Sequence, residues 1–121
     1  MSSMYSDTTP FKNLHQFTAA IRILQGHDPQ MQLQTVICYL MVAQFGPCHL
    51  SNIRDTANVS QASVSRNCSA LGTIHRRGIP GLGLVETWED PMNRKSKLVG
   101  LTKKGILLKQ SLVSAISREY G

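Results

Sequence analysis

Acidic residues are scarce in this sequence. Its 121 residues include seven Asp and Glu against thirteen Lys and Arg, which gives a formal net charge of +6 at pH 7. Such a surplus attracts phosphate backbones and anionic membrane surfaces, and charge alone does not choose between them. A chain of this length fits one compact domain, which leaves no room for a separate catalytic domain, so we expect a single functional site within residues 1–121.

Long apolar runs are also missing. The longest, from Val36 to Ala43, is far shorter than the roughly 20 residues that a membrane-spanning helix needs. The first residues lack the basic start and apolar stretch of a secretory signal. These two features predict a cytoplasmic protein without a membrane partner.

The sequence has few cysteines, and their spacing does not suggest that they pair. Cys38, Cys48 and Cys68 are odd in number and form no CxxC pair, which argues against a disulfide framework and against a zinc site. Cys38 and Cys68 fall in predicted helices, where the interpretation as small buried hydrophobes is better supported than a thiol switch. We expect reduced thiols, no metal and no cofactor.

Catalytic motifs are absent as well. The sequence has no Gly-x-Ser-x-Gly elbow, no phosphate-cradling loop and no paired carboxylates. None of its histidines has a second ligand or a carboxylate at useful spacing, and we interpret all of them as surface or boundary residues: His15, His27, His49 and His75. The sequence indicates a protein that is not an enzyme.

Apolar residues at helical spacing predict helices over residues 9–26, 31–45, 51–58, 60–75 and 102–120. Ser51, Ser60 and Thr102 are the expected N-caps of the last three. The helix over residues 31–45 is apolar on nearly all sides, which predicts that it is buried.

Residues 77–83 are too rich in Gly and Pro for regular structure and predict a loop. Two β-compatible runs follow, Leu84–Trp88 and Lys97–Leu101, joined by a charged, turn-rich connection that indicates a hairpin. The predicted fold class is mainly α with a small β-hairpin wing, a winged helix-turn-helix.

The two short helices separated by Asn58 and Val59 have the length and pattern of a DNA-reading helix-turn-helix. Small residues at the start of the second helix let its backbone approach DNA, where Ser and Gln side chains bond base edges or phosphates. Arg66 adds a charged fork for phosphate or guanine. A capped helix with a merely solvated polar face has the same pattern, but the basic hairpin downstream favours DNA binding. The predicted DNA contacts are Ser60, Gln61, Ala62, Ser63, Ser65, Arg66, Asn67, Arg76, Arg77, Arg94, Lys95 and Lys97.

Two motifs resemble the MarR family of winged-helix regulators. The first is Val59-Ser60-Gln61-Ala62-Ser63-Val64-Ser65-Arg66. The more specific second motif is Asp90-Pro91-Met92-Asn93-Arg94, followed by Lys97-Leu98-Val99-Gly100-Leu101-Thr102-Lys103-Lys104-Gly105.

The resemblance spans Met31 to Leu112. It implies a DNA-binding core over residues 49–101, with a recognition helix at residues 60–75 and a wing at residues 90–97. It also implies that the terminal helices, 9–26 and 102–120, pair two subunits, and that Asp90 orients Arg94 toward the minor groove.

Three features depart from the family pattern. Arg54 stands where a small buried residue is usual, Asn93 replaces a frequent acidic residue, and residues 76–83 lengthen the connection into the wing. We expect the Arg54 side chain to extend outward to a phosphate, because an unpaired buried charge is very costly.

These observations predict a sequence-specific regulator that binds double-stranded DNA as a homodimer, with RNA polymerase as a further partner to consider. Two alternatives stay open, because a fold does not fix a function. One is a winged-helix module for protein interaction. The other is an accessory factor that binds DNA without sequence preference.

Overall fold

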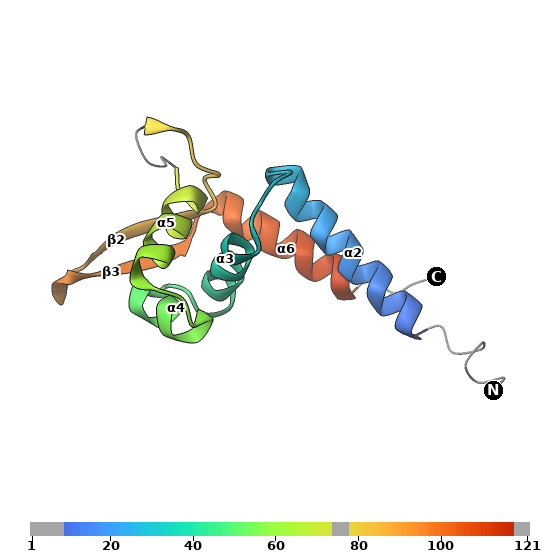
Figure 1. Ribbon diagram of the computed structural model, residues 1–121, viewed down its shortest axis with the longest axis horizontal. Coiled ribbons are helices and arrows are strands. Elements are labelled where there is room, and N and C mark those ends of the chain that lie inside the picture. Colours follow the sequence, from blue (N-terminus) through green and yellow to red (C-terminus); the bar gives the residue numbers. More distant parts are fainter. Residues whose placement is uncertain (1–8, 74–77, 118–121) are drawn as a thin grey trace.

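The computed structural model describes residues 9–73 and 78–117. At one end α2 (Thr9–His27) and α6 (Lys103–Ser117) run side by side (Figure 1). The other end holds α3 (Leu33–Phe45), α4 (Leu50–Ala57), α5 (Gln61–Leu71) and a β-hairpin. The predicted fold class, mainly α with a small β wing, is confirmed.

The hairpin belongs to a three-stranded antiparallel sheet in the order β1-β3-β2. Its strands are β1 (Cys48–His49), β2 (Val85–Asp90) and β3 (Asn93–Leu101). β1 was not predicted, because two residues are too few to show an alternating pattern. The wing strands also extend further than predicted, with Glu89 opposite Lys97, so that Pro91 and Met92 alone form the turn.

Two of the three predicted caps are confirmed. The backbone N–H of Ser63 donates to Ser60 Oγ at 3.1 Å, and that of Gly105 donates to Thr102 Oγ1 at 3.1 Å. The prediction for Ser51 is wrong, since α4 begins at Leu50 with His49 as its N-cap. α5 ends at Leu71, before Gly72, whereas the prediction ran to His75; residues 74–77 lie outside the described residues.

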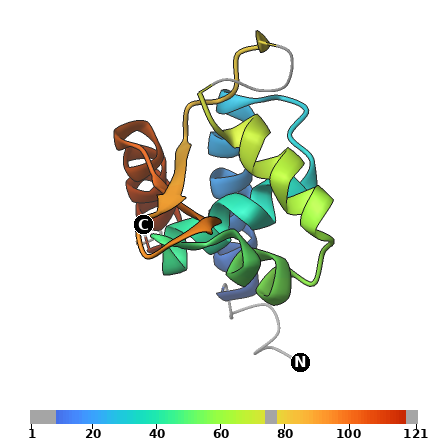
Figure 2. The same ribbon diagram turned by 90° about the vertical axis from the view of Figure 1, so that its left-hand side faces the viewer.

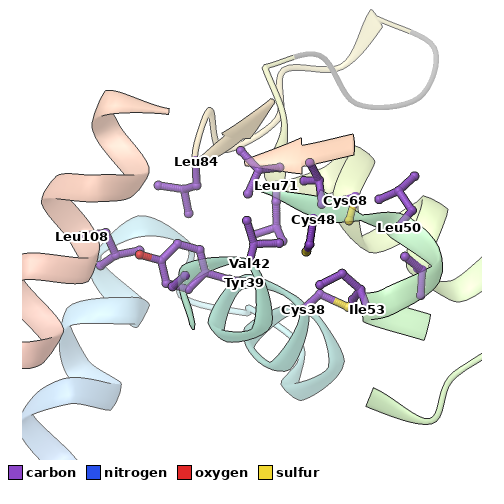
Figure 3. Packing of buried hydrophobic residues seen from close by; sticks show 14 of the residues in the cluster. Cys38, Tyr39, Val42, Cys48, Leu50, Ile53, Cys68, Leu71, Leu84 and Leu108 are labelled. Atoms are coloured by element: carbon purple, nitrogen blue, oxygen red, sulfur yellow. The ribbon is translucent and has the colours of Figure 1, made fainter. Parts of the chain in front are cut away.

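The core gathers around one face of α3. Tyr39 and Val42 pack there with buried side chains from α4, α5 and α6 (Figure 3). Burial raises the pKa of Tyr39 to about 12, and its hydroxyl donates to the Gly105 carbonyl oxygen at 2.8 Å. The prediction that α3 is buried is confirmed for one face, whereas its two ends leave Leu33 76% exposed and Phe45 57% exposed.

Gly105 allows the first turn of α6 to touch the backbone at the start of the wing. A Cβ at this position would collide with the Leu84 carbonyl oxygen. The Thr102 backbone N–H donates to that same oxygen at 3.0 Å. α6 and the wing are therefore joined by direct backbone packing that only glycine permits.

α2 packs mainly on α6. Ala20 and Leu24 of α2 and Leu108 and Leu112 of α6 are buried in this pairing. Other positions of the two helices leave large apolar side chains exposed, and these are Phe11, Leu14, Phe17, Ile106, Leu107, Val113 and Ile116. Among the described helices, none combines the length and apolarity that crossing a bilayer requires.

All three cysteines are free and buried, in α3, β1 and α5. Burial raises the pKa of each thiol, to about 12 for Cys68. Because the thiolate is the reactive form, these side chains act as small core residues. Within residues 9–73 and 78–117, no three His, Cys, Asp or Glu side chains gather as a metal site would require.

Candidate nucleic-acid interface

The turn between α4 and α5 is fixed by local backbone contacts. Asn58 adopts the left-handed conformation at φ 55°, which a short polar side chain tolerates, and it ends α4. The Val59 backbone N–H donates to the Arg54 carbonyl oxygen at 3.1 Å. Ser60 then caps α5, and buried Ile53 and Val64 belong to the core beneath the two helices. This is a helix-turn-helix with a capped second helix.

Two residues predicted to contact DNA face inward instead. Ser63 and Asn67 are buried against α3, where Ser63 Oγ donates to Gln34 Oε1 at 2.8 Å and Thr35 Oγ1 donates to Asn67 Oδ1 at 2.7 Å. Asn67 Nδ2 also donates to the Ser63 carbonyl oxygen at 2.9 Å. Their predicted place on the exposed face is wrong, because these polar side chains fill the contact between α5 and α3.

We expect Asn67→Ala to lower the free energy of unfolding by about 2 kcal/mol, since it leaves the buried Thr35 hydroxyl without its acceptor. Chemical denaturation followed by circular dichroism measures this loss. Gln61→Ala, at an exposed position of the same helix, is the control and should change stability by less than about 0.5 kcal/mol. Equal effects of the two substitutions would contradict the inward role of Asn67.

The outward face of α5 carries the other predicted contacts of this helix. Gln61, Ala62, Ser65 and Arg66 are exposed, as is the cap Ser60. Most of these outward side chains are short, so a ligand can approach the helix backbone closely. Arg66 itself borders a separate pocket that Gln30, Gln34 and Leu82 also line.

A cleft of about 930 Å³ separates α5 from the wing. Gln61 and Ser65 line it from α5, Arg54 from α4, and Lys95 and Lys97 from β3. In Figure 2 the light green α5 and the orange hairpin lie at the same end of the molecule. The cleft therefore has a polar wall on the helix, and its wall on the wing is basic apart from Glu86 of β2.

Sequence reasoning missed several side chains of this cleft. Ser69 and Thr73 also line it and continue the row that Gln61 and Ser65 begin, at a spacing of four residues. This spacing could have identified Ser69 and Thr73 from the sequence alone. Ser51 and Thr87 line it from α4 and β2, and nothing local in the sequence marks them.

Arg54 extends outward, as predicted, and its side chain is 41% exposed. Arg54 Nε contacts Asp55 Oδ1 at 2.8 Å, and Arg54 Nη1 donates to Gln61 Oε1 at 3.3 Å. The second bond joins the end of α4 to the first residue of α5, so Arg54 brings positive charge to the same cleft.

The wing carries exposed cations along β3. Arg94, Lys95 and Lys97 are all exposed, but Lys95 and Lys97 line the cleft and Arg94 does not. Successive strand residues face opposite sides of a sheet, which places Arg94 on the other face of the hairpin from Lys95. Arg76 and Arg77 lie outside the described residues.

Asp90 pairs with a histidine rather than with Arg94. Its Oδ2 lies 2.8 Å from Nε2 of His49, and its Oδ1 accepts the Met92 backbone N–H at 2.9 Å. Both contacts hold the pKa of the Asp90 carboxyl below its usual value, and the contact with His49 has the larger effect. The predicted Asp90–Arg94 pair is wrong because β1 brings His49 next to β3. His49 is a boundary residue, as predicted, but it has a carboxylate partner that the sequence did not reveal.

No protein-family model and no curated protein sequence matches this chain. Solved structures do resemble it. A mutant of MepR from S. aureus bound to an oligodeoxyribonucleotide is 21% identical with a TM-score of 0.65, covering 93% of this chain and 76% of that one. BpsR from Bordetella bronchiseptica, whose DNA binding is regulated by 6-hydroxynicotinic acid, is 18% identical with a TM-score of 0.58. That likeness covers 93% of this chain and 80% of BpsR.

A transcriptional regulator of the MarR family from a Rhodococcus species is 13% identical with a TM-score of 0.59. The likeness covers 94% of this chain and 71% of that regulator. At such low identity these comparisons establish the fold, which is the winged helix-turn-helix of MarR-family structures.

Proposed function

We propose that this chain, whose fold is that of MarR-family transcriptional regulators, binds double-stranded DNA with sequence preference and regulates transcription as a homodimer. The cleft between α5 and the wing carries the proposal, because it joins a small polar helix face to a basic strand. On DNA, α5 would enter the major groove while the wing reaches the neighbouring minor groove. The proposed contacts are Ser60, Gln61, Ala62, Ser65 and Arg66 on the helix, with Arg94, Lys95 and Lys97 on the wing.

The contacts divide into two kinds. Arg66, Gln61 and Ser65 have donors that suit base edges as well as phosphates. Lys95 and Lys97 supply charge without base selectivity and suit the phosphate track beside the groove. Arg54 is an additional phosphate contact, because it extends outward into the same cleft.

The exposed apolar faces of α2 and α6 support a dimer. Leu14, at 67% exposure, Phe17, at 62%, and Leu107, at 54%, lie on the two helices at the end opposite the wing. Large apolar patches on a soluble protein mark interaction surfaces. A twofold dimer through these helices would present two α5 helices to one face of DNA, so we expect a palindromic site. Light scattering after size exclusion tests the assembly, and a monomer would contradict it.

The decisive experiment selects bound fragments from randomised duplex DNA and sequences them. We expect a palindromic motif whose half-sites lie about one helical turn apart. Changing both Arg66 and Arg94 to alanine should abolish the enrichment, because each arginine contact is worth roughly tenfold in affinity.

The matched control changes Arg22 of α2 and Lys109 of α6 to alanine, which removes the same charge from exposed sites on other helices. Because both helices carry the proposed dimer surface, light scattering first checks that this variant keeps the assembly of the wild type. This variant should recover the motif of the wild type. Equal recovery of all sequences with steep salt dependence would support non-specific binding instead. Absence of binding at moderate salt would favour the protein-interaction module.

A further inference from the structure

The turn of the wing is apolar although the strand behind it is basic. Pro91 and Met92 occupy the apex, and Met92 is 92% exposed. The cations begin only at Arg94. The foremost side chain of the wing is therefore a large, unbranched apolar group.

Hydrogen bonds fix the backbone beneath this side chain. Asp90 uses both carboxylate oxygens, one toward His49 Nε2 at 2.8 Å and one for the Met92 backbone N–H at 2.9 Å. The His49 backbone is itself anchored, because His49 pairs with Leu98 in the sheet and directly precedes the first residue of α4. The Asp90 side chain is 15% exposed and that of His49 is 40% exposed, so the contact lies at the boundary between the core and solvent. One carboxylate thus ties the apex to the body of the protein.

We propose that Met92 is an apolar DNA contact at the wing apex and that His49 positions it through Asp90. The inference rests on the proposed function and adds the residue that enters the minor groove. Methionine is among the apolar side chains that proteins insert along minor-groove base steps and sugar faces. Arg94 and Lys95, set back on β3, would engage the phosphates on either side.

The contact of His49 with Asp90, and that of Asp90 with the Met92 backbone, hold the apex in one conformation before it binds DNA. A flexible turn would lose conformational freedom on binding, and that loss weakens affinity. His49 also lines the cleft, but its Nε2 is engaged by Asp90. It is accordingly a positioning residue, which acts through the orientation of Met92.

A double-mutant cycle tests this arrangement. Affinity for the selected duplex is measured by fluorescence anisotropy for the wild type, His49→Ala, Met92→Ala and the double variant. We expect Met92→Ala to weaken binding roughly tenfold, as burial of a methionine side chain predicts. His49→Ala should weaken binding by a smaller factor, and the double variant should bind no more weakly than Met92→Ala alone.

His49→Gln serves as the conservative variant, because its amide nitrogen can donate where Nε2 does, and it should restore most of the affinity. Ile79→Ala, at another exposed apolar position, is the control for Met92 and should bind like the wild type. Thermal unfolding of each variant shows whether a loss of affinity comes from a loss of stability. Met92→Ala should leave the unfolding temperature unchanged, because it removes only an exposed side chain.

If Met92→Ala bound the duplex as tightly as the wild type does, the inference would be overturned. The proposed function would still stand, because the wild type binds. Independent, fully additive effects would overturn the positioning role of His49. If the wild type bound no duplex at all, the proposed function would fail and this inference with it.

Discussion

Arg66→Glu is expected to weaken DNA binding by on the order of 100-fold, the largest effect of any single substitution on α5. Arg66 is exposed on the outward face of the helix, where the neighbouring Ala62 and Ser65 are short enough to allow close approach to DNA. Glutamate would remove a charge-assisted hydrogen bond and place a negative charge against phosphates. In a dimer the loss would occur at both half-sites. Titration of the selected duplex by fluorescence anisotropy, at two salt concentrations, measures the effect.

Arg22→Glu is the matched control, because Arg22 is also an exposed arginine on a helix and the change in charge is identical. It lies on α2, away from the cleft, so its direct effect on DNA should be limited to the weak long-range field. Light scattering checks that the reversal leaves the assembly unchanged, because α2 carries part of the proposed dimer surface. If both reversals weakened binding equally, net charge would explain the result and the specific role of Arg66 would be rejected.

Gly105→Ala should lower the free energy of unfolding by about 3 kcal/mol or more. The new Cβ would collide with the Leu84 carbonyl oxygen, a backbone atom that cannot rotate away as a side chain can. Relief requires α6 to separate from the start of the wing, which also disturbs the bond between the Tyr39 hydroxyl and the Gly105 carbonyl. Urea denaturation and calorimetry measure the loss.

Gly26→Ala gives the corresponding control in the last turn of α2. No atom lies within 4 Å of the Cβ that it would add, so this substitution should be neutral or stabilising by about 0.5 kcal/mol. A Gly105→Ala protein as stable as Gly26→Ala would show that α6 can shift without cost, contrary to the close packing described above.

Much of the fold could be predicted because its signals are local. Ser60 and Thr102 cap their helices through residues three positions ahead, and the apolar periodicity needs no partner to be recognised. The two strands of the wing were found, but their length was underestimated. The outer ends of these strands are solvated on both faces, so their residues are polar throughout. They show no alternation of apolar and polar residues from which a strand could be predicted.

The errors arose where distant segments meet. Ser63 and Asn67 look like surface residues until Gln34 and Thr35 of α3 lie opposite them. The contact between His49 and Asp90 joins residues 41 positions apart and depends on a strand too short to predict. Spacing along the chain carries no information about such distant pairs. The residues four positions apart from Gln61 to Thr73, in contrast, could have been recognised in the sequence.

The pairing of α2 with α6 also sets an order of assembly while the chain is being made. α2 precedes every other described element in the sequence, and α6 follows them all. The segment from α3 to β3 is continuous and holds most of the core, so it can condense while synthesis continues. α2 has no such opportunity, because the helix that covers Ala20 and Leu24 has not yet left the ribosome. We therefore expect the pairing of α2 with α6 to form only after α6 has been translated.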